Sequence, residues 1–398
     1  MNKATAGGAR HVLLYEPRVE GHHLGWLRFI VEDLLSADWS LTVAADLRPD
    51  HEATVREQLG GLVSAVALVN AYNPSGRRHG DGKTGAVLHN LRESGAAQVF
   101  LCALDEVASY CCRRAAFGIF PPAELGGRFG GIYHRPRFFV APWWSPNRWL
   151  KQVGFQRLLQ SRRVRPLLFV DEYLARELRA RFPTTPIFFL PDPCPPGYDG
   201  NRATARQRLN LPANKCVFLF YGGGYRRKGL HLAVRALLAL PMDAPAFLLC
   251  AGRQNPTGET ARGLEQLARQ NRARLINRYV SVSEEKEVFA ASDVVLLPYL
   301  NHYGASGVLS RAVAAGKPVI VSNEQLLGRL VREHGLGLLF PSGDMPALSE
   351  CIRQAVQFSP EVIGRFATAA RTYAERYSRA AYRLALLNAL DSCVKNAA

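Results

Sequence analysis

Short apolar runs alternate with longer amphipathic segments throughout the first half of the chain. HVLLYEP (residues 11–17) is an apolar run that ends at a proline, and LRFIVEDLLSA (27–37) has apolar residues at helical spacing. LLFVDEYLARELRARF (167–182) repeats this change from a strand pattern to a helix pattern. Such alternation predicts a parallel sheet with helices on both faces. Further strand candidates are LTVAAD (41–46), AVALV (65–69), QVFLCAL (98–104) and RFFVAPW (137–143).

A proline-rich segment separates this series from a second one. Between Phe188 and Lys215 the chain has five prolines and little periodicity, which indicates a linker. Strand and helix patterns resume at VFLFYGGG, and a helical pattern covers the tail from Glu361 to Val394. We therefore expect an α/β protein with two doubly wound, Rossmann-like domains. The domains are expected over residues 1–190 and 191–365, with C-terminal helices at 366–398.

The composition fits a globular protein of two domains. The chain has 398 residues, 48% of them hydrophobic and 21% charged, and a single core stops growing near ~250 to 300 residues. No apolar stretch reaches the ~18 to 20 residues of a membrane helix, and the first residues lack the pattern of a signal peptide. The eight cysteines form no Cys-x-x-Cys pair and no zinc-like spacing with histidine. We therefore expect reduced thiols in a cytoplasmic protein.

Much of the net charge of +17 comes from one part of the first half. Residues 113–181 contain fourteen Arg or Lys and four Asp or Glu, interleaved with aromatic residues that include Trp143, Trp144 and Trp149. This mixture suits a membrane surface, a polyanion or ordinary solvated helices over an aromatic core. We hypothesise peripheral docking on the anionic inner face of a membrane. We expect no nucleic acid partner, because no nucleic-acid-binding module is recognised.

Two loops in the second half have the composition of phosphate-binding loops. Ligands of doubly wound domains collect at the carboxyl ends of strands. YGGGYRRKG (221–229) places three glycines before the cations at 226–228 and the start of a helix. HYGASGVLS (302–310) places Ser306 at a predicted helix start, whose unpaired amides can bind an anion. The alternative for Ser306 is an ordinary helix N-cap.

A third loop, in the first half, is a candidate for substrate contact. EGHHLGW (20–26) places Gly21, His22 and His23 before the first predicted helix, although a single histidine is more often structural. Asp105 follows the strand candidate QVFLCAL, and we expect it at the same edge. Motifs of nicotinamide or flavin enzymes, P-loop nucleotide triphosphatases and serine hydrolases are absent: Gly-x-Gly-x-x-Gly after the first strand, Gly-x-x-x-x-Gly-Lys-Ser/Thr and Gly-x-Ser-x-Gly.

Five stretches between Val217 and Asp344 have the order and spacing of one known family. They are FYGGGYRRKGLHLAVRAL, AFLLCAG, VSVSEEKEVFAASDVVLLPY, SGVLSRAVAAGKPVIVS and HGLGLLFPSGD. The second half therefore resembles the retaining glycosyltransferases of the GT-B fold, in particular glycosyltransferase family four; the first half agrees more loosely. The resemblance implies two Rossmann-like domains facing across a cleft, the first for the acceptor and the second for a nucleoside diphosphate sugar. It also implies a final helix that crosses back to the first domain.

The resemblance assigns roles to single residues. Lys228 and Arg227 match contacts to the donor diphosphate, and with His22 they form the expected catalytic group. No metal and no cofactor besides the nucleotide-sugar donor are expected, because cations and helix-start amides can stabilise the leaving diphosphate. The expected donor contacts are Gly222, Gly223, Lys228, Tyr279, Val280, Gly304, Ser306, Gly307 and Arg311. The expected acceptor contacts are Gly21, His22, His23 and Asp105.

One departure from the family affects the donor site. The family commonly carries two glutamates around the loop at 302–310, and the matching residues here are Tyr303 and Arg311. An arginine only donates hydrogen bonds, so it cannot replace a carboxylate that accepts them from hydroxyl groups. We expect a glycosyltransferase with an unidentified acceptor. The alternative is an inactive GT-B protein that acts as a binding or scaffold subunit.

Overall fold

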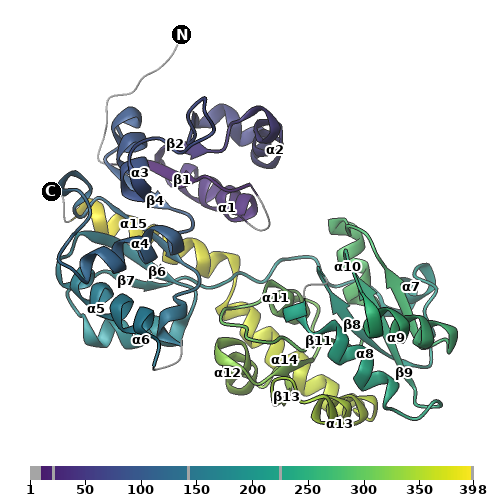
Figure 1. Ribbon diagram of the computed structural model, residues 1–398. Helices are drawn as coiled ribbons and strands as arrows, with labels where there is room; N and C mark the ends of the chain where they lie inside the picture. Colours follow the sequence, from purple (N-terminus) through teal and green to yellow (C-terminus); the bar gives the residue numbers. More distant parts are fainter. Residues whose placement is uncertain (1–9, 20–22, 141–143, 224–225, 396–398) are drawn as a thin grey trace. The chain divides into compact units, whose positions relative to one another are not determined.

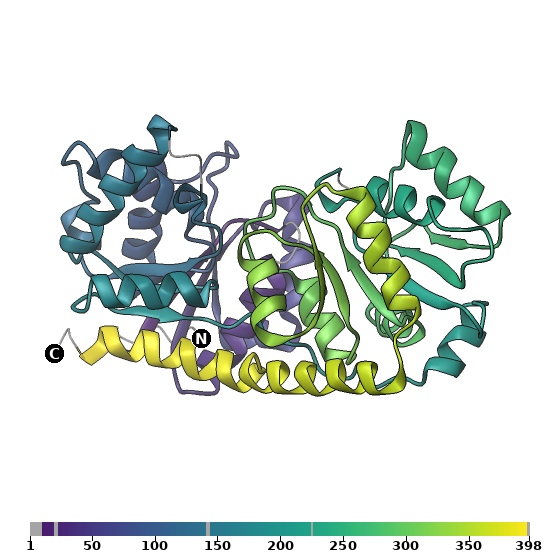
Figure 2. The same cartoon turned by 90° about the horizontal axis from the view of Figure 1, so that it is seen from below.

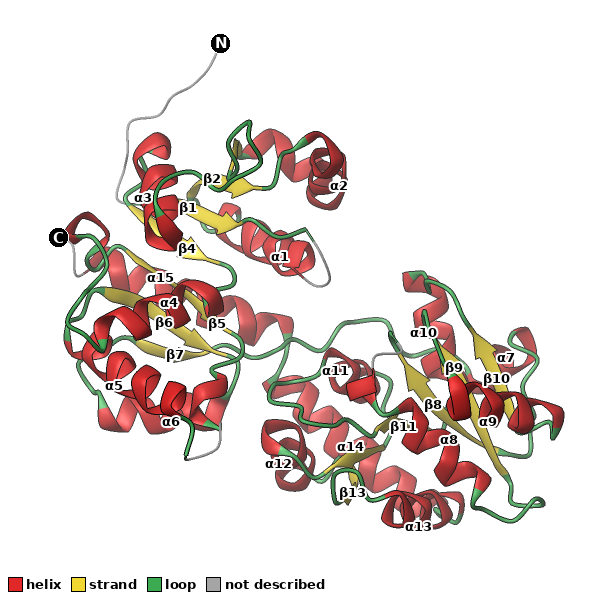
Figure 3. Ribbon diagram, in the orientation of Figure 1, coloured by secondary structure: helices red, strands yellow, loops and turns green. Residues whose placement is uncertain are grey.

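The computed structural model divides the chain into two compact units. In each unit, helices lie on both faces of a parallel sheet (Figure 3), as the sequence pattern predicts. Unit 1 runs to Pro191 and includes the chain from Tyr382 onward; unit 2 is Asp192–Ala381. The structure describes residues 10–19, 23–140, 144–223 and 226–395.

Unit 1 is built on a seven-stranded parallel sheet in the order β3-β2-β1-β4-β5-β6-β7 (Figure 1). Its core is apolar, because strands and helices bury runs of aliphatic and aromatic side chains against each other. The strands are β1 (His11–Glu16), β2 (Ser40–Ala45), β3 (Ala67–Asn70), β4 (Gln98–Leu101), β5 (Phe129–Tyr133), β6 (Val164–Phe169) and β7 (Ile187–Phe189). The helices are α1 (His23–Leu35), α2 (Pro49–Leu59), α3 (Gly82–Ser94), α4 (Asp105–Ala115), α5 (Pro146–Gln160), α6 (Glu172–Arg181) and most of α15 (Arg379–Lys395).

The fifth strand corrects the sequence prediction. In the described part of RFFVAPW there is no strand, and Arg137–Phe139 forms a 3-10 helix. The sheet instead uses β5, with the sequence FGGIY. A Cβ atom at Gly130 would overlap the carbonyl oxygen of Pro166 on the neighbouring strand. Close approach of the two strands therefore requires glycine here. Because glycine has no apolar side chain, this strand lacks the hydrophobic pattern that predicts strands.

Unit 2 has a six-stranded parallel sheet in the order β10-β9-β8-β11-β12-β13. Strand β10 ends at Ile276, and the residues between it and the helix that begins at Val282 form a loop. The strands are β8 (Cys216–Tyr221), β9 (Ala246–Ala251), β10 (Ala273–Ile276), β11 (Val294–Leu297), β12 (Val319–Ser322) and β13 (Gly337–Phe340). The helices are α7 (Arg202–Arg208), α8 (Leu230–Leu238), α9 (Gly258–Arg269), α10 (Val282–Ala291), α11 (Gly307–Ala314), α12 (Gln325–His334), α13 (Met345–Val356) and α14 (Pro360–Arg376).

The last helix joins unit 1 rather than unit 2 over most of its length. Figure 2 shows α15 in yellow, and its residues from Tyr382 onward belong to unit 1. The Tyr382 ring lies edge-on to Trp26 of α1, with 5.5 Å between the ring centroids. Arg10 forms an ion pair of 3.3 Å with Asp391. Both ends of the described chain thus stabilise the same unit.

Candidate functional site

The two loops predicted to bind phosphate lie side by side in unit 2. β8 and β11 are neighbours in the sheet, so the loops that follow them meet at its carboxyl edge. The backbone N–H of Leu300 donates to the carbonyl oxygen of Arg227 at 2.8 Å and joins the two loops. Gly229 has φ +77°, and a Cβ atom there would overlap the carbonyl oxygen of Pro298. Glycine is therefore required where the loops touch.

Lys228 links the first loop to the second through consecutive side-chain contacts. Its Nζ donates a hydrogen bond of 2.7 Å to Oη of Tyr299 and lies 4.1 Å from the centre of that ring. Tyr299 is only 1% exposed, so its position is fixed by packing. The same Oη lies 3.3 Å from Oγ of Ser306 at the start of α11. Tyr299 thus connects the ammonium group of Lys228 to the start of α11.

Ser306 does not act as an ordinary N-cap in the described structure. Its hydroxyl makes no capping bond to α11 and faces Tyr299 instead. His302 supports the loop, because its backbone N–H donates to Oε2 of Glu324 at 2.9 Å and its ring packs edge-on against Tyr299. Gly304 is buried in the loop, and Gly307 is the first residue of α11. The Ser306 hydroxyl therefore does not cap the backbone amides at the start of this helix.

Gly222 is fixed by a buried glutamine that sequence reasoning missed. The Gly222 backbone has φ +105°, and its N–H donates to the Ala251 carbonyl oxygen at 2.9 Å. Gln254 is fully buried, and its Nε2 donates to the Gly222 carbonyl oxygen at 2.5 Å. Oε1 of Gln254 has no hydrogen-bond partner within the described residues. The signal in the sequence that could have identified Gln254 is its position as a polar residue just after strand β9. Gly223 follows Gly222 at this edge.

Tyr279 and Val280 lie in the loop after β10, at the same carboxyl edge. Tyr279 is 79% exposed, whereas Val280 is buried. Arg278 pairs with Glu284 at 2.5 Å, and this hydrogen bond, with further bonds from Ser281, lowers the pKa of Glu284 to about 2. The loop is therefore anchored at its base while the Tyr279 ring faces solvent.

Arg311 belongs to a half-buried polar network rather than to a solvated helix face. Its Nε lies 2.8 Å from Oε1 of Glu285, and its Nη1 donates to the Gly307 carbonyl oxygen at 2.8 Å. The hydroxyls of Tyr198 and Tyr221 also donate to the Glu285 carboxylate, the latter at 2.5 Å. Burial alone would lower the pKa of Arg311, but the Glu285 charge outweighs it and raises that pKa. Sequence reasoning missed Glu285, because its partner lies on another helix.

The predicted acceptor loop is described only in part. Gly21 and His22 lie outside the described residues, and His23 is the first residue of α1. Nδ1 of His23 lies 3.0 Å from Oε2 of Glu16, a buried carboxylate at the end of β1. The Arg18 backbone N–H donates to the other Glu16 oxygen at 3.2 Å. Glu16 therefore orients His23 at the carboxyl edge of the unit 1 sheet.

Asp105 organises a neighbouring loop. Its carboxylate accepts backbone hydrogen bonds from His134 at 3.1 Å and Arg135 at 2.6 Å, just after β5. Nε2 of His134 lies 2.9 Å from the Cys102 carbonyl oxygen, and its ring packs edge-on against Trp26. Burial lowers the pKa of His134, which favours the neutral ring. Asp105 thus reaches this edge mainly through the loop that it holds, and an acceptor contact stays a prediction.

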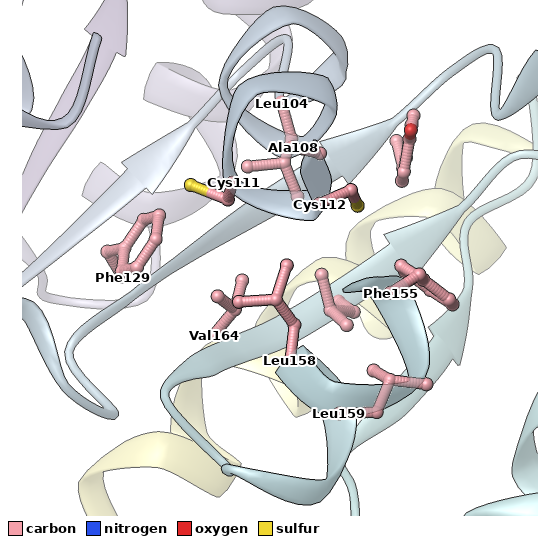
Figure 4. A pocket seen from close by; sticks show the side chains of 11 residues that line it. Leu104, Ala108, Cys111, Cys112, Phe129, Phe155, Leu158, Leu159 and Val164 are labelled. Carbon is pink, nitrogen blue, oxygen red and sulfur yellow. The ribbon is translucent and has the colours of Figure 1, made fainter. Parts of the chain in front are cut away.

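Other parts of the described chain offer fewer candidates. A small cavity in unit 1 is lined by core side chains without charge, including Leu104, Cys112 and Phe155 (Figure 4). Within the described residues, no group of three or more His, Cys, Asp or Glu side chains is arranged to hold a metal ion. Among the helices described, none has both the length and the hydrophobicity of a membrane span.

Comparisons with known proteins relate part of this chain to a family. Residues 201–372 match the model of glycosyl transferases group 1. D-inositol 3-phosphate glycosyltransferase of Saccharomonospora viridis is 30% identical over 189 residues, which cover 45% of this chain and 43% of the relative. The corresponding enzyme of Corynebacterium urealyticum is 29% identical over 191 residues, 46% of this chain and 44% of the relative. This chain thus spans less than half the length of the curated relatives that it matches.

A solved structure covers both units. Sucrose-phosphate synthase of Thermosynechococcus elongatus has a TM-score of 0.68 at 17% identity, over 98% of this chain and 100% of that chain. At this identity the likeness shows the fold, which is the GT-B arrangement of two parallel α/β sheets. Residues 201–372 thus match the glycosyl transferases group 1 family, and the chain has the GT-B fold.

Proposed function

We propose that this chain transfers a sugar from a nucleoside diphosphate sugar to an acceptor, with the donor diphosphate at the adjoining loops of unit 2. The observation that carries the proposal is the contact chain from Lys228 through Tyr299 to Ser306. It holds an ammonium group beside a helix start, and both features bind phosphate. Family membership of residues 201–372 supports the same assignment.

The chemistry follows from the charge that develops during transfer. When the bond between the sugar and the diphosphate breaks, negative charge grows on the leaving diphosphate. Lys228, Arg227 and the amides of Ser306 and Gly307 stabilise that charge without a divalent metal. We propose retention of the anomeric configuration, following the family resemblance, with the acceptor proton passing to the donor phosphate. His23 and Asp105 in unit 1 are the proposed acceptor side.

The nucleoside is proposed to lie toward Tyr279 and Val280. The exposed Tyr279 ring offers a surface for stacking a base, and the unpaired Oε1 of buried Gln254 can accept a hydrogen bond. HepE of Anabaena was crystallised with UDP, and its structure has a TM-score of 0.67 at 14% identity over 96% of this chain and 100% of that chain. UDP-sugars are therefore the first donors to test.

A second candidate is a protein that binds the donor without transferring the sugar. It is favoured by Tyr303 and Arg311, which stand where the family has carboxylates. Glu285 brings a carboxylate beside Arg311, but Arg311 and two tyrosine hydroxyls already engage it. The two candidates therefore differ in turnover rather than in donor binding.

The test is release of nucleoside diphosphate from a panel of nucleotide sugars, followed with and without candidate acceptors. Transfer predicts catalytic release with at least one donor, at a rate that an acceptor increases. Tight donor binding without any release above the uncatalysed rate would favour the second candidate. If no donor binds, both candidates are wrong.

A further inference from the structure

Three cationic side chains of unit 1 converge on a single carboxylate at the carboxyl edge of its sheet. Arg18 forms an ion pair with Glu106, while Nη1 of Arg78 and Nζ of Lys83 lie 3.4 and 3.3 Å from Oε2 of the same residue. We name these four residues the basic cluster. They come from the loop after β1, the loop after β3, the start of α3 and the first turn of α4. The topology therefore brings four separate segments together at this edge.

The charge of the basic cluster is not balanced from within. One carboxylate faces three cations, so two positive charges remain in the group. Burial lowers the pKa of Lys83, and Arg78, Arg113 and Arg18 lower it further by repulsion. Exposed ion pairs add little stability, so gathering like charges here has no evident benefit to the fold. The cluster has the electrostatic form of an anion site.

The four side chains are open enough to meet a ligand. Their exposed fractions range from 26% for Arg78 to 38% for Glu106. Arginine presents several N–H donors in one plane, which suits an oxyanion, and lysine adds a compact charge. A phosphate monoester can accept hydrogen bonds from all three cations at once. A single carboxylate such as Glu106 leaves some of these donors unused.

A buried hydroxyl within the electrostatic reach of Arg78 gives independent support. Tyr15 on β1 is 3% exposed, and its Oη has no hydrogen-bond partner within the described residues. Burial raises the pKa of Tyr15 to about 12, although the nearby positive charge of Arg78 opposes the rise. An unpaired buried hydroxyl destabilises a fold unless something bonds to it. A phosphate oxygen beside Arg78 would supply the missing partner.

We infer that the acceptor carries a phosphate group, which Arg18, Arg78 and Lys83 bind in unit 1 with help from the Tyr15 hydroxyl. This inference deepens the proposed transfer reaction and rests on it, since it names the chemical class of the acceptor. Glu106 holds the three cations in place and competes with the ligand. The phosphate group belongs either to a small soluble molecule or to a lipid headgroup.

The test is titration of the whole 398-residue chain with inorganic phosphate at constant ionic strength. It is done in the Lys228→Ala background, so that phosphate does not report the donor loops. Arg78→Gln and Lys83→Gln each remove one charge-assisted hydrogen bond, and we expect about tenfold weaker binding. Arg77→Gln, an exposed neighbour in the same loop, is the matched control and should change the affinity less than twofold.

Two further variants separate binding from folding. Glu106→Gln removes the competing carboxylate, so phosphate should bind several-fold more tightly. Tyr15→Phe removes the unpaired hydroxyl, so the thermal midpoint should stay or rise while phosphate binding weakens. No saturable phosphate binding, weaker binding in Glu106→Gln, or an equal loss in Arg77→Gln would overturn the inference. Absence of UDP binding to the chain with Lys228 intact would instead refute the proposed donor site and leave these titrations valid.

Vesicles distinguish the two sources of phosphate. Phosphatidylcholine vesicles with and without phosphatidic acid, a lipid with a phosphate monoester headgroup, are sedimented with the same variants. Sedimentation that requires phosphatidic acid and is lost in Lys83→Gln assigns the site to a lipid. Binding of inorganic phosphate, without any sedimentation that Lys83→Gln reduces, assigns the site to a soluble acceptor. Failure of both probes contradicts the inference.

Discussion

Replacing Lys228 with alanine tests the assumption that this side chain contacts the donor diphosphate. The side chain donates to Tyr299 at 2.7 Å in the structure, so a bound diphosphate would meet an ammonium group already held in place. A charge-assisted hydrogen bond is worth ~1.5 to 3 kcal/mol, and more where charge develops in the transition state. With ~1.4 kcal/mol per decade, kcat/KM for the donor should fall roughly ten- to several-hundredfold.

The fold should tolerate this change well. Lys228 is half-buried at a loop, and Tyr299 keeps its contact with Ser306, so we expect a stability loss within ~1 kcal/mol. Arg235→Ala removes the same charge from an exposed position on α8 and serves as the matched control. Tyr299→Phe keeps the ammonium group but removes its anchor, which is worth ~0.5 to 1.5 kcal/mol, so a smaller loss of roughly two- to tenfold is expected.

The assay is steady-state release of nucleoside diphosphate, with thermal unfolding measured in parallel. We expect kcat/KM to be lowest in Lys228→Ala, intermediate in Tyr299→Phe and highest in Arg235→Ala, with similar unfolding midpoints for all three. Full donor affinity and full turnover in Lys228→Ala would show that the diphosphate lies elsewhere. An equal loss of kcat/KM in Arg235→Ala would show that the effect comes from the overall charge and not from a contact with the donor.

The remaining predictions concern other parts of the structure. Arg311→Ala should lower the free energy of unfolding by ~1 to 3 kcal/mol in urea denaturation, because it leaves Glu285 without its cation; an unchanged midpoint would contradict the network. If unit 1 binds membranes, the chain should sediment with anionic but not with neutral vesicles. Trp149→Ala removes a ring that is 57% exposed and should reduce this sedimentation; equal sedimentation with both kinds of vesicle would refute electrostatic attraction to the membrane. Turnover should survive EDTA, and a loss restored by magnesium or manganese would refute metal independence. Burial raises the pKa of Cys111 and Cys112 to about 12, so iodoacetamide at pH 8 should label them only on unfolding; rapid labelling of the native chain would refute this.

The sequence predicted the architecture because its signals are local. Alternating apolar runs and amphipathic segments indicate two parallel sheets, and the rule for carboxyl ends of strands brings the two donor loops to one edge. The contact between Leu300 and Arg227 agrees with that expectation. Strand β5 was missed for an equally local reason, since its glycines are required by neighbouring backbone at Gly130 and carry no hydrophobic signal.

The site details could not be predicted from local patterns. The family resemblance predicts a donor contact for Arg311; its partner Glu285 comes from a different helix, and only the folded chain brings them together. Gln254 stands next to Gly222 for the same reason. The acceptor contact of Asp105 stays a prediction; the hydrogen bonds that its carboxylate accepts from the backbone after β5 could not be read from the sequence. Pairings between distant segments are set by packing, which a single sequence does not display.

The central claim is that unit 2 binds a nucleoside diphosphate, and thermal unfolding with uridine, guanosine, adenosine and thymidine diphosphates tests it most directly. A ligand at one hundred times its dissociation constant adds ~2.7 kcal/mol to stability. For a unit of this size, that corresponds to a rise of roughly 5 to 10 °C in the unfolding midpoint. The account predicts such a rise with at least one of the four, first of all uridine diphosphate, and without added metal. No rise with any of them, at concentrations up to several millimolar, would contradict it.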